Sequence, residues 1–210
     1  MLTVTPRTKG AITELGNITC TGSFSLNAKK CDLTGDITVS GIMPKLIVGN
    51  VLYSTSPIVV TVSGSSESTS SAMLLMAGNV SDLNLFSDNY PIKAIKVNNW
   101  LNNDGAHPQI VSTWLGSITC KENFEADIIL SGENAVSDIA LKSATIKGNI
   151  NNSLWQIDGH VKKISAPALD GLTLLVGVNE GITQPTGSEE NDIEEQFSLT
   201  LALTGAGECM

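Results

Sequence analysis

Few side chains in this sequence could carry out catalytic or metal chemistry, and their spacing favours neither. The two histidines are His107, in the stretch GAHPQ, and His160, in DGHVKK. Neither has the spacing of a Ser/His/Asp arrangement or of a metal-ligand cluster. We interpret both as turn residues, and we predict no catalytic, cofactor-binding or metal-binding residue and no cofactor.

The densest group of titratable side chains is the acidic stretch SEENDIEE. Its carboxylates are Glu189, Glu190, Asp192, Glu194 and Glu195. This many oxygen ligands could bind Ca²⁺ if the loop folded back on itself, but no EF-hand pattern is present. The stretch is therefore interpreted as a solvated acidic loop, with calcium binding left open as the alternative.

The tryptophans and cysteines allow two readings each. Trp100, Trp114 and Trp155 could form a stacking platform for carbohydrate, or they could cover an end or an insertion of the fold.

The four cysteines lack C-x-x-C spacing, which weakens a zinc or redox interpretation; they are Cys20, Cys31, Cys120 and Cys209. Cys20 and Cys120 are expected to be small buried residues, and a Cys20–Cys31 disulfide is the less favoured alternative.

Charge and composition exclude other classes of protein. The chain has 12 basic and 21 acidic residues, a formal net charge of -9, and Arg7 is its only arginine. Nucleic-acid recognition depends on arginine and positive fields, so a nucleic-acid partner is not expected. The N-terminal segment has no signal-peptide pattern and no window is apolar enough to cross a membrane, so membrane insertion is not expected either.

Strand signals occur along most of the chain. Short segments rich in Ile, Val, Leu and Thr end at Gly or Asn, as in DITVSG, PIVVTVSG, ADIILSG, SATIKGNI and FSLTLALTG. One stretch, SAMLLMAG at residues 71–78, could be a short helix or a strand. With 41% hydrophobic and only 4% aromatic residues, the core must consist of aliphatic layers.

A recurring unit of Gly, one polar residue and Ile or Val predicts how these strands connect. Its copies begin at Gly16, Gly35, Gly49, Gly78, Gly116, Gly148 and Gly159. Gly permits a tightly bent backbone, and the β-branched residue can then point inward as a strand begins. Such corners stack in a parallel β-helix. The expected fold is therefore all-β, a parallel β-helix (β-solenoid) with irregular coils, and the expected inward residues are Ile18, Ile37, Val51, Ile118, Ile150 and Val161.

A longer repeat suggests equivalent positions along the helix axis. LGNITC at residues 15–20 returns as LGSITC at residues 115–120. We interpret the interval as about five coils, with Leu15 and Ile18 on the same face as Leu115 and Ile118.

The chain is expected to form a single β-solenoid domain over residues 1–210. Polar or turn-rich composition predicts loop insertions near 63–71, 98–109 and 179–195.

Three phrases between residues 115 and 181 carry a resemblance to a known group of proteins. They are LGSITCKENFEADIILSG, ALKSATIKGNINNSLWQIDGHVKKISA and ALDGLTLLVGVNEG. They resemble the β-solenoid repeats of large secreted or cell-surface proteins of planctomycete-type bacteria. The resemblance is clearest over 115–195 and looser over 12–51. It implies an extracellular or cell-surface setting, although this chain shows no signal peptide, and it supplies no catalytic residues.

Two functional classes follow. The favoured one is a non-catalytic structural or adhesive β-solenoid segment whose partners are other modules of a larger surface protein or glycans. The alternative is a polysaccharide-acting β-helix enzyme, a lyase or glycosidase, or a carbohydrate-binding module. A glycosidase needs paired acid and base groups, which this sequence does not cluster.

Overall fold

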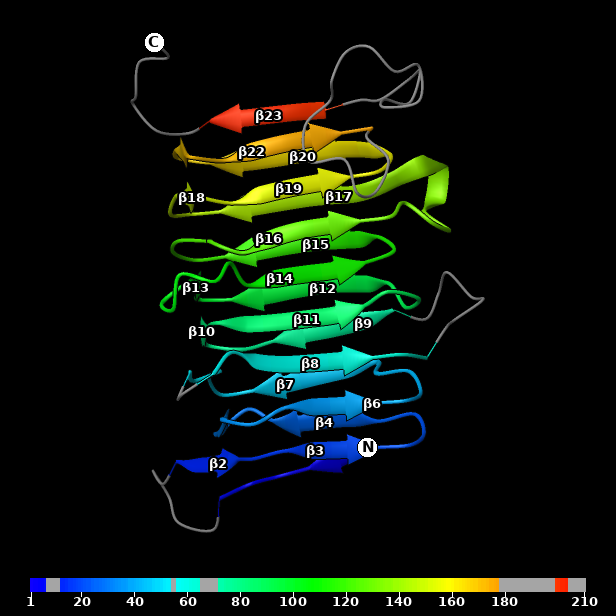
Figure 1. Ribbon diagram of the computed structural model, residues 1–210, viewed down its shortest axis with the longest axis vertical. Coiled ribbons are helices and arrows are strands. Elements are labelled where there is room, and N and C mark those ends of the chain that lie inside the picture. Colours follow the sequence, from blue (N-terminus) through cyan, green and yellow to red (C-terminus); the bar gives the residue numbers. More distant parts are fainter. Residues whose placement is uncertain (7–11, 54–55, 65–71, 178–198, 204–210) are drawn as a thin grey trace.

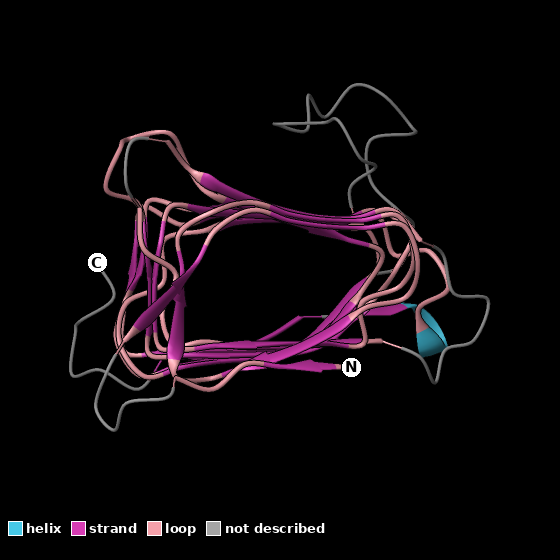
Figure 2. Cartoon of the chain, turned by 90° about the horizontal axis from the view of Figure 1, so that it is seen from below, coloured by secondary structure: helices cyan, strands magenta, loops and turns pink. Residues whose placement is uncertain are grey.

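A computed structural model shows a parallel β-helix, as the sequence predicts (Figure 1). The structure describes residues 1–6, 12–53, 56–64 and 72–177 together with the backbone of 199–203. Viewed along the axis, successive coils superimpose on one outline with two long walls and a shorter one (Figure 2).

One long wall is sheet A, a nine-stranded parallel sheet. Its strands are β1 (Leu2–Thr3), β4 (Ser25–Ala28), β7 (Lys45–Val48), β9 (Met73–Met76), β12 (Ile92–Val97), β15 (Leu115–Cys120), β17 (Ile139–Ile146), β20 (His160–Ala166) and β23 (Leu199–Leu203).

The other long wall is sheet C, an eight-stranded parallel sheet, with one strand for each of eight coils. Its strands are β3 (Ile18–Cys20), β6 (Ile37–Val39), β8 (Ile58–Val62), β11 (Leu83–Ser87), β14 (Gln109–Ser112), β16 (Asp127–Leu130), β19 (Leu154–Ile157) and β22 (Thr173–Val176).

The short wall, which we name face B, consists of three two-stranded pairs. They are β2 (Thr13–Leu15) with β5 (Cys31–Leu33), β10 (Asn79–Ser81) with β13 (Asn99–Leu101), and β18 (Ile150–Asn151) with β21 (Leu169–Asp170). Isolated parallel bridges at Val51 and Phe124 join these pairs into one column. Each coil therefore runs from face B to sheet C and then to sheet A.

Alternating burial explains why these short segments are strands. In β8 the burial of successive residues alternates between buried and half-buried, so that Ile58, Val60 and Val62 point into the core. The ambiguous stretch at 71–78 also follows this period: Met73 and Leu75 of β9 are buried. It is a strand and not a helix, because its apolar side chains fill an interior bounded by sheets.

The coils differ in length because loops leave them at the corners. Residues paired in neighbouring strands of sheet C are 18 positions apart for Gln109 and Asp127, and 27 apart for Ile128 and Trp155. Of the insertion predicted at 98–109, Asn99–Leu101 form β13, so residues 102–108 form the loop itself. A further loop, 131–138, contains a short 3₁₀ turn (Val136–Asp138) and was not predicted.

The insertions predicted near 63–71 and 179–195 fall largely outside the described residues, which stop at 64 and 177 at these places.

The expected inward residues are in place, but they do not belong to one kind of corner. Buried members are Ile37, Val51, Ile118, Ile150 and Val161, and Ile18 of the first coil is partly buried against them. The seven Gly-containing units divide among several positions. Those at Gly16 and Gly35 lie between face B and sheet C, those at Gly49, Gly78 and Gly148 between sheet A and face B, and that at Gly159 between sheet C and sheet A.

The unit at Gly116 is not a corner at all, because Gly116 lies inside β15. The expectation that these units mark corners therefore holds for six of the seven and is wrong for Gly116. The physical reason is that every corner and every strand start of a β-helix selects the same small, polar and β-branched residues.

The prediction that residues 15–20 and 115–120 are equivalent is also wrong. Leu15 ends β2 on face B and Ile18 begins β3 in sheet C, whereas Leu115 and Ile118 both lie in β15 of sheet A. The same six-letter pattern bends around a corner in the first copy and runs straight in the second.

Candidate functional site

An open groove with a polar lining lies where face B meets sheet C. Its volume is about 620 Å³. Loop 102–108 contributes Asn102, Gly105 and His107 to its lining, and the following coils contribute further polar side chains. Its polar lining side chains are Asn102, His107, Asp127, Asn152, Ser153 and Thr173.

Asp82 anchors the loop that lines part of this groove. Its carboxylate is fully buried and accepts hydrogen bonds from the backbone N–H of Asn103 at 2.6 Å and of Asp104 at 3.3 Å. The side chains of Ser81 and Asn103 also donate to it. A buried carboxylate with this many donors fixes the start of the loop, because leaving it unpaired would be costly.

His107 and Asp127 are the one close pair of titratable groups in the groove. The imidazole Nδ1 lies 3.8 Å from the Asp127 carboxylate, beyond hydrogen-bond distance, and the His107 side chain is 47% exposed. Asp127 also accepts the backbone N–H of Leu154 at 2.7 Å. Burial raises the pKa of the Asp127 carboxyl, while the Leu154 hydrogen bond and the charge of His107 act in the opposite direction.

This arrangement offers limited chemistry. Among the described residues that line the groove, Asp127 is the one carboxylate. Glu125 on the same coil is committed to structure, since its carboxylate accepts from Asn102 at 3.0 Å and from Asn151 at 3.2 Å. Hydrolysis of a glycosidic bond by the usual routes requires two carboxyl groups facing one bond. The groove can bind hydroxyl groups, but its described residues supply only one of the two carboxyl groups that this hydrolysis requires.

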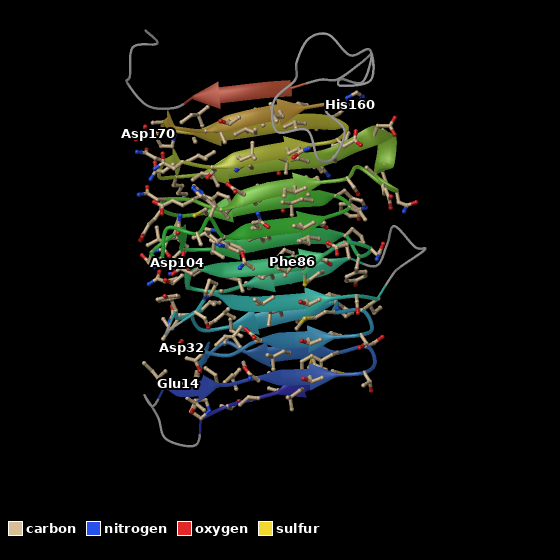
Figure 3. All side chains as sticks on the ribbon, in the orientation of Figure 1. Glu14, Asp32, Phe86, Asp104, His160 and Asp170 are labelled. Atoms are coloured by element: carbon tan, nitrogen blue, oxygen red, sulfur yellow. The ribbon has the colours of Figure 1, made fainter. Side chains whose placement is uncertain are left out.

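The second histidine lies apart from the first. His160 begins β20, after the corner between sheet C and sheet A, and Figure 3 places it at the edge opposite to Asp104. Within the described part of the chain, no group of three His, Cys, Asp or Glu residues could hold a metal ion. The acidic stretch 189–195, with its calcium alternative, lies outside the described residues.

Both alternatives for the tryptophans, a carbohydrate platform and the covering of an end or an insertion, are wrong for Trp100 and Trp155. Trp100 and Trp155 are fully buried in the core and contact Phe124 from either side, with ring centroids 5.9 Å away in both cases. Trp114 is half-buried at the end of the turn before β15. Two of the three rings therefore fill the solenoid interior. A side chain of this size needs more than one coil to enclose it, and here neighbouring coils do so together.

The cysteines that the structure describes are free thiols: Cys20, Cys31 and Cys120. The alternative of a Cys20–Cys31 disulfide is thus wrong; these residues lie on sheet C and face B. Cys120 is fully buried, as expected, and burial raises its pKa to about 11. A thiol in this state is a packing residue. Cys209 lies outside the described residues.

Sequence reasoning missed both Asp127 and the loop at 131–138. Asp127 begins a strand in the segment ADIILSG, where it read as a strand-flanking polar residue. A signal existed in the distance between the β16 and β17 strand patterns, which is longer than the corresponding distance in most other coils. The described part of the chain contains no helix that is long and apolar enough to cross a membrane.

Comparisons with protein-family models, with curated proteins and with solved structures found no match to this chain.

Proposed function

We propose that this chain is a non-catalytic structural or adhesive β-solenoid segment of a bacterial extracellular or cell-surface protein. The observation that supports this most strongly is the continuous stack of eight coils, paired in parallel along three walls. Stability in such a stack builds up from one coil to the next, which gives a stiff body. A stiff body of this kind suits a spacer or a support for a contact surface.

Side chains at the corners also strengthen the stack, because they form hydrogen bonds between successive coils. Asn17 accepts the backbone N–H of Asp36 at 2.9 Å, and Asp36 accepts that of Val59 at 2.9 Å. Asn123 accepts that of Asn149 at 3.0 Å. Each bond joins one coil to the next, so polar residues here are used for cohesion between coils. The partners of such a segment would be neighbouring modules of a larger surface protein or glycans.

The alternative is a polysaccharide-acting β-helix enzyme, and one observation favours it: the groove that contains His107 and Asp127. The raised pKa of Asp127 is a feature of many general acids. Against it stands the single carboxylate among the described lining residues.

Turnover measurements separate the two functions. We expect the purified chain to release no new reducing ends and no unsaturated sugar products from a panel of neutral, acidic and amino polysaccharides. Asp127→Asn and His107→Ala serve as matched controls in the groove. Activity of the native chain that both substitutions abolish would overturn the non-catalytic proposal.

A further inference from the structure

The charges of this acidic protein are segregated between its walls. Lysines of the described strands all lie in sheet A, whose strands contain no Asp or Glu; they are Lys45, Lys93, Lys96, Lys142, Lys162 and Lys163. The described strands of face B and sheet C contain no lysine. Acidic residues line the other side, and Figure 3 shows Glu14, Asp32, Asp104 and Asp170 along one edge.

The strand register arranges part of this lysine set into a column along the axis. Ile92 pairs with Leu115 and Leu115 with Leu141, which places Lys93 beside Gly116 and Gly116 beside Lys142. Leu141 pairs with Val161, which places Lys142 beside Lys162. Neighbouring strands lie about 4.8 Å apart, so the column presents positive charge at short, regular intervals with one gap at Gly116.

A cavity of about 420 Å³ opens at this gap. Its floor is Gly116, where an added Cβ would clash with the carbonyl oxygen of Lys93. Lys142, Lys162 and Trp114 also line the cavity.

The loop at 131–138 forms the apolar wall of this cavity. Val136 and Ile139 line it, and the Val136 side chain is 65% exposed, an unusual position for an apolar residue beside a half-buried tryptophan. Glu133 and Asp138 belong to the same segment but are not among the lining residues. Within the described residues, neither Lys142 nor Lys162 forms an ion pair with a carboxylate.

We propose that this cavity binds one sugar unit of an acidic polysaccharide, a polymer of uronic acids, that lies along the lysine column. Lys142 and Lys162 would hold the carboxylate through charge-assisted hydrogen bonds. The apolar face of the sugar ring would stack on Trp114 and contact Val136 and Ile139. The proposal rests on the adhesive part of the proposed function and gives it a site and a ligand class.

The same observations disfavour other polyanions. Nucleic acid is recognised through arginine forks and extended positive fields, whereas this chain has one arginine and a net charge of -9. An acidic peptide offers carboxylates but no flat apolar ring face for Trp114. A uronic acid offers both groups in one unit.

Calorimetric titration of the full chain with an oligogalacturonate at low ionic strength tests the site. We expect saturable binding that falls about tenfold in Lys142→Gln/Lys162→Gln and about fivefold in Trp114→Leu. The matched control is Lys29→Gln/Lys30→Gln, which removes the same charge from exposed lysines several coils away; here we expect less than a twofold change. Melting curves verify that each variant is folded.

Several outcomes would overturn the proposal. They are equal loss of affinity in the control variant, equally tight binding of poly-glutamate or DNA, and no binding of the oligogalacturonate. Any of these results would leave the spacer function intact, because the turnover assay tests the non-catalytic proposal separately.

Discussion

At the scale of single residues, close approach between coils decides where glycine is required. Gly16 and Gly35 occupy the same corner in successive coils and begin the same kind of unit. A Cβ on Gly35 would lie 2.5 Å from the backbone nitrogen of Asn17 and 2.5 Å from the carbonyl carbon of Gly16, whereas a Cβ on Gly16 would meet nothing within 4 Å. Of these two glycines, Gly35 is the one that contacts a described coil beneath it at that point.

This difference predicts unequal effects of one substitution. Gly35→Ala should lower the free energy of unfolding by about 1–3 kcal/mol, since the clash is with backbone that cannot move away cheaply. Gly16→Ala, the matched control, should change it by less than about 0.5 kcal/mol. Guanidinium denaturation followed by circular dichroism measures both. Equal effects in the two variants would show that the backbone conformation of the corner, and not contact between coils, requires glycine.

At the scale of elements, a ladder of one aspartate and five asparagines lies at the corner between sheet A and face B in successive coils, and hydrogen bonds join several of its members. Asn50 donates from its backbone and side chain to Asp32, at 2.8 and 2.9 Å, and accepts the backbone N–H of Asn79 at 2.9 Å. The residue after each ladder member is a core residue of face B. The pairs are Asp32–Leu33, Asn50–Val51, Asn79–Val80, Asn99–Trp100, Asn123–Phe124 and Asn149–Ile150.

Removal of one member of the ladder should weaken two interfaces between coils. Asn50→Ala leaves the N–H of Asn79 and one bond to Asp32 without their partner, which should cost about 1–3 kcal/mol of unfolding free energy. Asn89→Ala, an exposed position in the turn after β11, is the control and should cost less than about 0.5 kcal/mol. Thermal melting at neutral pH compares them, and similar losses in both variants would contradict a role for the ladder.

This ladder also shows what the sequence could and could not predict. Strand period and Gly-polar-Ile/Val units were enough to predict the parallel β-helix. The units at Gly49, Gly78 and Gly148 are ladder positions. The positions of Asn99 and Asn123 were missed, because Asn98 and Glu122 stand there in place of Gly, and Trp100 and Phe124 in place of Ile or Val. Which corner a residue occupies depends on the residues of the coil beneath it. Because the loops differ in length, equivalent corners do not recur at a fixed spacing in the sequence.

The candidate sites were harder to predict for the same reason. Lys93, Gly116, Lys142 and Lys162 are neighbours only through strand register, and their separations in sequence are unequal. Buried Trp100 and Trp155 could not be distinguished from surface rings by composition, since the interior can take aromatic residues where several coils stack above and below.

At the scale of the whole molecule, stability should be nearly one-dimensional, because each coil contacts chiefly the coils beside it. Phe124 joins two such neighbours in the middle of the stack. It bridges Trp100 and Ile150 on face B, and its ring contacts those of Trp100 and Trp155. The described coils before and after Phe124 therefore depend on this residue for much of their mutual packing.

Phe124→Ala should therefore lower cooperativity as well as stability. We expect a loss of about 3–5 kcal/mol and a shallower dependence of unfolding on guanidinium, because the coils on either side can then unfold separately. Phe24→Ala in the first coil, where the ring is only half-buried, should affect the end coil and leave the slope nearly unchanged. Hydrogen exchange should show the same contrast, with faster exchange spreading to both sides of the middle coils in Phe124→Ala and remaining near β3 and β4 in Phe24→Ala. A Phe124→Ala variant that unfolds in one transition of native slope would show that coupling between coils extends beyond nearest neighbours.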